Sequence, residues 1–495
     1  MMRRLLIATL VSTLTLLGVP TAAGAQPAVE ASPRAESSSS LRWTECEGDR
    51  LKGAQCAFLR VPRDWARPSA GNYRIAVARI RAEVAPTRGV LMFNPGGPGG
   101  AGLDALRFVQ RGLPKEVRDS FDIVTFDPRG VGESQPNFAP CRTPQPDLPV
   151  TGAVDWDAVT TAHVDAMSAA LQECLEVNRA DARFVGTWQV IRDVDSLRRA
   201  LGVQKISFWG MSYGTTVGRA YAQQFPQRLR ALVLDGTITP TPSVGDYARE
   251  HIWDDATAIQ TMLGAFGAKS KRAYRTVMNF LERQTIPTED GDVLTRWSVS
   301  GYLVNNAAYQ SQWDDARQLI NELYAAIRTA RAVSRDAAQR ITSSAVTTRS
   351  RGGSNPAYHF VNCSDMHDRP SVRVIAGAAE QAAKVGGTAL GATPLGEGTQ
   401  CAGLPPLGRS VPPLAGTLRL PTPPVIVNSI GDNRTPWLGA RETANAFTGS
   451  SMITYAGTQH VAYTGTSACV DAAVTPYLLD LTLPPRSVAC PLVYP

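Results

Sequence analysis

The sequence predicts an α/β fold: a mostly parallel sheet flanked by helices, with a large helical segment inserted before the last strands. Apolar segments rich in Val, Ile, Leu and Phe recur in the first half of the chain, and most end in glycine. Strands that are buried on both faces of a parallel sheet have this character. A helical pattern lies between two of them, and a long helical stretch precedes the last strand-like segments.

The expected elements follow from this pattern in chain order. Strands are predicted at residues 73–82, 89–97, 121–130, 205–210 and 229–236. Residues 188–202 carry apolar side chains at helical spacing and end at Gly202, which predicts a crossover helix. From about 238 to 419 the pattern is helical, and strand-then-loop character returns at 421–436 and 451–463 before a final helix at 469–483.

The N-terminus has the composition of an export signal. Arg3 and Arg4 precede a short apolar run at 5–19, and small residues at 23–25 offer a cleavage site. This pattern predicts a secretory signal peptide, with a retained N-terminal anchor as the alternative. No other stretch approaches the roughly 18 apolar residues of a membrane span.

These patterns divide the chain into five segments. The predicted boundaries are a signal peptide at 1–25, a disordered leader at 26–40, a first core segment at 41–237, a helical cap at 238–419 and a second core segment at 420–495. Removal of the signal lowers the formal charge from +7 to +5, and the remaining Lys and Arg are scattered. A nucleic-acid partner is therefore not expected.

Eight cysteines support the exported location. None stands in a C-x-x-C pair, so a zinc or redox motif is not expected. An even number of cysteines in an exported chain predicts disulfides, and free buried thiols are the alternative. Pairing of nearest neighbours closes short loops and predicts Cys46–Cys56, Cys141–Cys174, Cys363–Cys401 and Cys469–Cys490.

The segment FWGMSYGTTVG at 208–218 places Ser212 between two glycines, after an apolar strand and before a helical pattern. A G-x-S-x-G in this setting is typical of the nucleophile elbow of α/β-hydrolases. The amides at the start of the following helix favour negative charge near the serine. Ser212 is therefore the predicted nucleophile, and an ordinary surface turn is the alternative.

A serine hydroxyl needs a base, and the fold places the acid and then the histidine after the serine. Of five histidines, only His460 follows a late strand-like segment, which makes it the predicted base. Asp432 follows the strand before it and is the predicted acid, which would orient the imidazole and stabilise its protonated form. Asp235, at the end of an earlier strand, is the rival acid.

An oxyanion formed during the reaction needs N–H donors. The amide of Tyr213, which follows the nucleophile, is one predicted donor, and the amide of Gly97 in the glycine-rich loop at 93–102 is the other. A phosphate-binding loop is not indicated, since no G-K-[ST] follows. The sequence implies no cofactor and no metal.

Six motifs together resemble the secreted tripeptidyl aminopeptidases of actinobacterial type, in the prolyl-aminopeptidase-like branch of the α/β-hydrolases. In chain order they are NPGGPGG, FDPRGVGES, GMSYGT, LVLDG, NCSD, and a late D-x-x-T-P followed by a histidine. The resemblance covers the chain from about residue 41 to its end. It implies the same roles for Ser212, Asp432 and His460, an oxyanion hole at 96–99, and a helical cap over the site.

The resemblance also implies that acidic side chains bind the free N-terminal amine of a peptide. Asp365 in NCSD is the candidate, and a charge or helix-capping role beside a disulfide is the alternative. The chain departs from the family at Ala101, where a serine is frequent, and at TQHVA (458–462), where GHG is frequent.

The predicted function is a secreted serine exopeptidase, free or attached to the cell wall, that releases short peptides such as tripeptides from free N-termini. Its partners would be peptides with a free N-terminus. The alternative enzyme is a secreted carboxylesterase or lipase with the same triad. A non-catalytic binding protein of this fold is a further alternative, because fold does not determine function.

Overall fold

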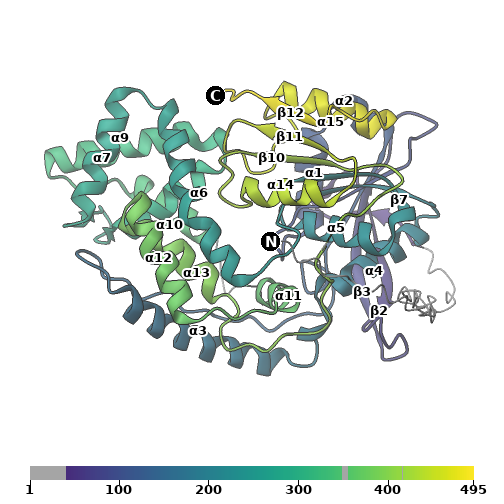
Figure 1. Cartoon of the computed structure of the whole chain (residues 1–495), viewed down its shortest axis with the longest axis horizontal. Coiled ribbons are helices and arrows are strands. Elements are labelled where there is room, and N and C mark those ends of the chain that lie inside the picture. The colour runs from purple at the N-terminus through teal and green to yellow at the C-terminus, as the bar shows by residue number, and fades with distance from the viewer. Residues whose placement is uncertain (1–40, 348–354, 415, 495) are drawn as a thin grey trace, which may run out of the picture. The chain divides into compact units, whose positions relative to one another are not determined.

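A central sheet organises the protein. A computed structural model describes residues 41–347, 355–414 and 416–494, so the predicted signal peptide at 1–25 and leader at 26–40 lie outside the described residues. The ten strands of the sheet lie in the order β1 (Thr44–Glu45), β2 (Gln55–Pro62), β3 (Asn72–Ile80), β5 (Asp122–Phe126), β4 (Val90–Asn94), β6 (Ile206–Met211), β7 (Leu229–Asp235), β10 (Val425–Ser429), β11 (Ser451–Tyr455) and β12 (Ser487–Cys490) (Figure 1).

The prediction of a mostly parallel sheet is confirmed. All neighbours from β5 through β12 pair in parallel, whereas β1, β2 and β3 are joined to each other and to β5 in antiparallel fashion. The register places Asn94 of β4 beside Gly210 of β6, and Met211 of β6 beside Asp235 of β7. The carboxyl ends of these strands therefore meet at one edge of the sheet.

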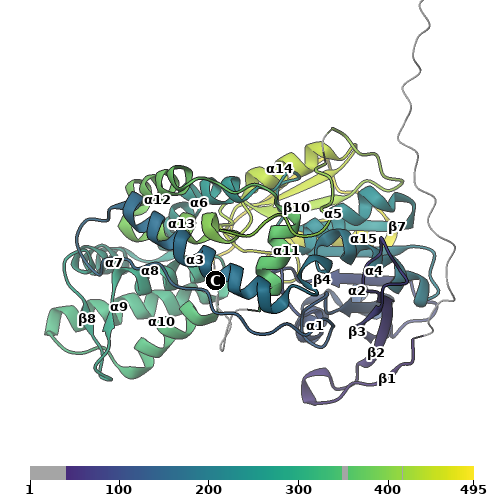
Figure 2. The same ribbon diagram turned by 90° about the horizontal axis from the view of Figure 1, so that it is seen from below.

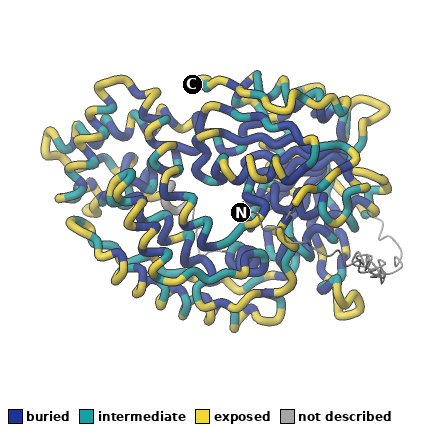
Figure 3. Tube along the Cα trace, in the orientation of Figure 1, coloured by how far each residue is buried: buried dark blue, intermediate teal, exposed yellow. Residues whose placement is uncertain are grey.

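Both faces of the sheet are covered by helices, because alternate strand residues point to opposite sides. On β4, Val90 and Met92 join one apolar cluster, and Leu91 and Phe93 join another. The first cluster includes residues of α4 (Thr187–Ala200), α5 (Gly214–Gln224) and α14 (Trp437–Ala446), and the second those of α1 (Gly102–Gly112), α2 (Lys115–Ser120) and α15 (Ala468–Asp480). The central strands β4, β6 and β10 are accordingly buried along their length (Figure 3).

A group of helices lies between β7 and β10 in the sequence. The inserted helices are α6 (Val244–Ala265), α7 (Ala268–Leu281), α8 (Arg296–Ala307), α9 (Trp313–Thr329), α10 (Arg335–Thr347), α11 (Ala357–Asp365), α12 (Val372–Gly386) and α13 (Ala392–Thr399), with a small hairpin of β8 (Ile286–Pro287) and β9 (Val293–Leu294). The buried apolar residues of α6 to α10 form a core of their own around Trp313 and Leu319, whereas Phe360 and Val361 of α11 join the first cluster of the sheet. The inserted helices other than α11 lie to one side of the sheet in both views, whereas α11 lies close to the sheet (Figures 1 and 2).

Helix α3 (Trp156–Asn178) packs with the inserted helices although it precedes β6 in the sequence. It contacts α12 and α13, and it lies beside them in both views (Figures 1 and 2). The segment before the predicted boundary at residue 237 thus contributes to the group of inserted helices as well as to the sheet.

Four disulfides join the eight cysteines in the nearest-neighbour pairing predicted from the sequence. One of them, Cys363–Cys401, ties α11 to the segment after α13. Such bonds are typical of exported proteins. In the part of the chain that the structure describes, every helix is too short or too polar to cross a membrane.

Candidate active site

Ser212 occupies the sharp turn between β6 and α5. Its φ is 55°, which is strained for a residue with a side chain, and its N–H donates to the Asp235 carbonyl at 2.9 Å. A Cβ on Gly210 would lie 2.3 Å from the Gly214 carbonyl oxygen, so the turn requires glycine there. The serine side chain is partly exposed and lines a cavity.

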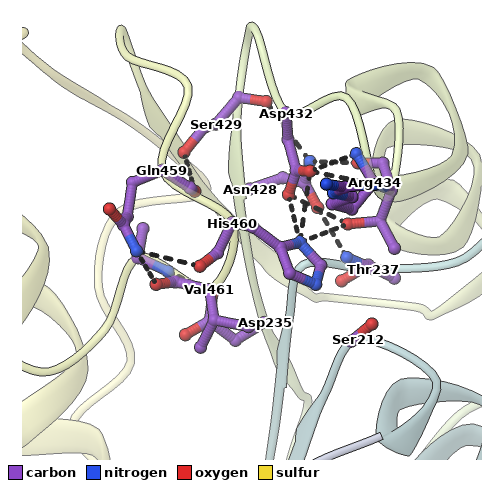
Figure 4. Close-up of polar contacts among 12 residues, drawn as sticks. Ser212, Asp235, Thr237, Asn428, Ser429, Asp432, Arg434, Gln459, His460 and Val461 are labelled. Atoms are coloured by element: carbon purple, nitrogen blue, oxygen red, sulfur yellow. Dashed lines mark hydrogen bonds and ion pairs between the residues drawn. The ribbon is translucent and has the colours of Figure 1, made fainter. Parts of the chain in front are cut away.

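His460 and Asp432 form a buried pair above this serine. The imidazole Nδ1 lies 3.1 and 3.0 Å from the two carboxylate oxygens of Asp432. The opposite side of the ring faces the Ser212 hydroxyl (Figure 4). The structure therefore brings together the three residues predicted as nucleophile, acid and base.

The Asp432 carboxylate is fixed by the loop that follows it. It accepts hydrogen bonds from the N–H groups of Arg434 and Thr435 at 2.8 and 3.0 Å, and from the Thr435 hydroxyl at 2.9 Å. That hydroxyl also lies 3.3 Å from His460 Nδ1. The carboxylate is fully buried, so these donors replace the water it lacks.

Asp235, the rival acid, contacts the loop of His460 rather than its ring. Its carboxylate accepts from the N–H groups of Ala462 and Tyr463 at 2.8 and 2.9 Å. Its carbonyl accepts from Ser212, so one residue holds both the serine turn and the histidine loop. Burial raises the pKa of Asp235 to about 7, and the two N–H donors and the nearby His460 oppose that rise.

Two amides predicted as oxyanion donors lie beside Ser212. Among the described residues, neither the Gly97 nor the Tyr213 N–H donates to another protein group. A Cβ on Gly96 would lie 2.8 Å from the Tyr213 nitrogen and 2.9 Å from the Ser212 Cβ. Only glycine there allows the loop after β4 to approach the serine so closely.

A cavity of about 1400 Å³ opens from Ser212 toward the inserted helices. Its wall includes Gly97, Tyr309 of the segment after α8, Tyr358 of α11 and Glu397 of α13. The volume exceeds the roughly 300–1,000 Å³ of ordinary small-molecule pockets. In the described residues, no cluster of His, Cys, Asp and Glu is arranged to hold a metal ion.

The charged side chains in the cavity wall differ in exposure and in their bonding partners. Of its three carboxylates in the described residues, Asp147 and Asp315 are exposed, whereas Glu397 is half-buried. Of its two arginines, Arg340 pairs with Glu322 at 2.9 Å, whereas Arg434 bonds the Asn305 side-chain oxygen.

Asp365, the residue predicted to bind a substrate amine, lies behind the serine turn and is absent from the cavity wall. Its carboxylate accepts from the Thr187 N–H at 3.1 Å, from the Thr187 hydroxyl, and from the Tyr213 hydroxyl at 2.9 Å. Burial raises the pKa of Asp365, and these hydrogen bonds and Arg219 oppose the rise. The carboxylate thus ties α11 and the start of α4 to the residue after Ser212.

Several residues of the site were missed by sequence reasoning. Thr435 bridges the acid and the histidine, and the motif D-x-x-T-P that contains it was the available signal. The ring of Tyr309 lies edge-on to His460, with centroids 6.4 Å apart. Arg434 stands in the same motif, at a position that the motif leaves open. No sequence pattern indicates Tyr309 or Glu397, because they come from segments that only the fold brings to the site.

Comparison with known proteins agrees with this geometry. A family model described as the alpha/beta hydrolase fold matches residues 89–464. The chain belongs to the α/β-hydrolase fold family. It is 30% identical over 479 residues to the serine protease Hip1 of Mycobacterium tuberculosis, with 91% of each chain covered. It is 28% identical over 499 residues to the tripeptidyl aminopeptidase of Streptomyces lividans, with 91% of this chain and 86% of that protein covered.

A third relative has a different activity in its name. Carboxylesterase B of Mycobacterium tuberculosis is 29% identical over 491 residues, which cover 90% of this chain and 89% of that protein. Enzymes of the α/β-hydrolase fold place nucleophile, acid and histidine in the order found here. The chain is a serine hydrolase of this fold.

Proposed function

We propose that the protein is an exported serine exopeptidase that releases short peptides from free N-termini. The observation that carries the proposal is the cavity beside Ser212, which has the half-buried carboxylate of Glu397 in its wall. A free amine needs such a partner, whereas an ester substrate does not. The similarity to a tripeptidyl aminopeptidase supports the same function.

The contacts of the site support the following reaction. His460 takes the proton of Ser212 as the hydroxyl oxygen attacks the scissile carbonyl, and Asp432 stabilises the imidazolium through Nδ1. The amides of Gly97 and Tyr213 donate to the oxyanion. His460 then gives the proton to the leaving amine, and a water molecule hydrolyses the acyl-enzyme by the same steps.

Glu397 is proposed to bind the substrate amine in place of Asp365. Among the described residues, its carboxylate has one weak hydrogen bond, from the Gln400 amide at 3.5 Å, and so is free to accept from an ammonium group. Asp365 is already bonded to Thr187 and Tyr213. The inserted helices that form the cavity wall would exclude folded proteins and admit chain ends.

Export is proposed from the predicted signal peptide at 1–25 and supported by the four disulfides. A chain without this signal should stay in the cells that make it. Secretion of such a chain would contradict the proposal.

The test is a paired rate measurement on the purified protein. A tripeptide anilide with a free amine is compared with its N-acetyl derivative, and Ser212→Ala is the matched inactive control. We expect a free-amine preference of at least tenfold, about the value of one charge-assisted hydrogen bond. Equal rates, or cleavage of a simple ester alone, would support the second candidate, a carboxylesterase, which the similarity to carboxylesterase B favours.

A further inference from the structure

Arg434 presents its guanidinium to the cavity from the loop that also carries the proposed catalytic acid. Its N–H donates to Asp432, which fixes the main chain of the residue. Its side chain lines the cavity together with Thr435, Tyr309 and Asn305. Arg434 lies beside the Asp432–His460 pair (Figure 4).

The positive charge of Arg434 has no anionic partner in the part of the chain that the structure describes. Its guanidinium bonds the neutral Asn305 side chain, and Asp432 is already bonded to His460 and Thr435. Two fully buried arginines differ in this respect, whereas the buried Arg219, which lies outside the cavity wall, also bonds a neutral side chain, that of Gln223. Arg129 pairs with Asp193 at 2.6 Å, and Arg296 pairs with Glu282 at 2.6 Å.

A half-buried guanidinium favours a planar anion, because its fork of N–H groups matches a carboxylate. The cavity also holds the opposite charge, on Glu397, and Tyr358 lines the same cavity. Glu397 and Arg434 form no ion pair with each other or with another described residue. A ligand with one amine and one carboxylate would satisfy both groups.

We propose that Arg434 makes the enzyme selective for peptides with a carboxylate close to the scissile bond. The inference rests on the proposed exopeptidase function and adds the substrate class. Arg434 lines the same cavity as Ser212, so the carboxylate would belong to a residue that flanks the cleaved bond. It is either an acidic side chain or the C-terminal carboxylate of a very short substrate.

The experiment uses matched peptides with a free N-terminus, a neutral sequence and an amidated C-terminus. Each position in turn carries Gln or Glu, and a second arm compares the shortest cleaved peptide as acid and as amide. We expect the carboxylate form to be cleaved with at least about tenfold higher kcat/KM at one flanking position or in the second arm. The preference should weaken in high salt, because an ionic contact is screened.

Three variants test the assignment to Arg434. Arg434→Gln should bring the ratio of carboxylate to amide rates close to one, and Arg434→Lys should retain part of the preference. Arg340→Gln is the matched control, since Arg340 lines the same cavity but is paired with Glu322. It should keep the wild-type ratio. Thermal unfolding of each variant shows that the chain is folded.

The inference is overturned if neither arm prefers a carboxylate, or if Arg434→Gln keeps the preference. Cleavage of the neutral peptides separately tests the proposed function. If no peptide is cleaved but esters are, the exopeptidase proposal fails, and the role of Arg434 can still be tested. Arg434 is then tested with an aryl hemisuccinate against its methyl ester, for which the same tenfold preference and the same loss in Arg434→Gln are expected.

Discussion

The charged groups at the carboxyl ends of the strands, called the sheet edge here, have different hydrogen-bond partners from those in the wall of the cavity. At the sheet edge, main-chain N–H groups fix both aspartates: two bond Asp432, and two bond Asp235. In the cavity wall, Glu397 and Arg434 each have a neutral side-chain partner. Charges fixed by the backbone are suited to one repeated reaction, whereas charges without ionic partners are suited to binding a ligand.

The largest effect is expected at the sheet edge, from Asp432→Asn. An asparagine keeps the shape but cannot stabilise an imidazolium, so kcat should fall by about 10³- to 10⁴-fold. Steady-state kinetics on a tripeptide anilide measure this fall, and thermal unfolding is the control for folding. A loss of less than about tenfold would contradict the acid role and return it to Asp235.

The variant Asp235→Asn tests whether the two aspartates have different roles. The amide can accept from only one of the Ala462 and Tyr463 N–H groups, so the loop of His460 should shift. A misplacement of a catalytic group by about 1 Å can cost about 100-fold in rate, so kcat should fall by about 10- to 100-fold. A fall as large as that of Asp432→Asn would show that Asp235 does more than position the loop.

The loss of stability caused by the same substitution should depend on pH. Folding raises the pKa of Asp235 from 3.8 to about 7, so between these values the folded chain holds a proton that the unfolded chain releases. This contribution to stability is present at low pH and is lost as the pH rises through about 7. The stability difference between wild type and Asp235→Asn should therefore shrink from about pH 5 to about pH 8, as measured by thermal unfolding. A difference that grows with pH would contradict the assignment.

The difference between the sheet edge and the cavity wall also explains which residues of the site can be predicted from the sequence. Motif and chain order indicate Ser212, Asp432 and His460 because glycine flanks, apolar strands and scarce histidines are local features. The sequence does not indicate Glu397 or Arg434, because the absence of an ionic partner depends on distant residues.

Two elements of secondary structure also show what the sequence pattern does not indicate. Strand β2 alternates buried and exposed residues at the sheet's antiparallel end and was not predicted. The buried side of α3 faces α12 and α13, which follow it by about 200 residues. A helical pattern indicates that a helix has a buried face, and it does not identify the elements that cover that face.

Glu397→Gln tests the cavity wall and should have a smaller effect than the changes at the sheet edge. Loss of the charge should raise KM for a free-amine anilide by about tenfold and leave the N-acetyl derivative unaffected. Asp147→Asn is the matched control, because Asp147 lines the same cavity but is exposed. An equal effect of both variants on KM would indicate a general electrostatic attraction rather than an amine site.

Asp365→Asn should have the smallest effect on activity, because its carboxylate bonds other protein groups and lies outside the cavity wall. The amide keeps one acceptor for Thr187 and Tyr213, so kcat should change by less than about threefold. The melting temperature should fall by a few degrees, about what one weakened buried hydrogen bond costs. If the variant instead raised KM for the free amine and spared the N-acetyl substrate, Asp365 rather than Glu397 would bind the amine. A buried carboxylate behind the serine turn would then have to open toward the cavity when substrate binds.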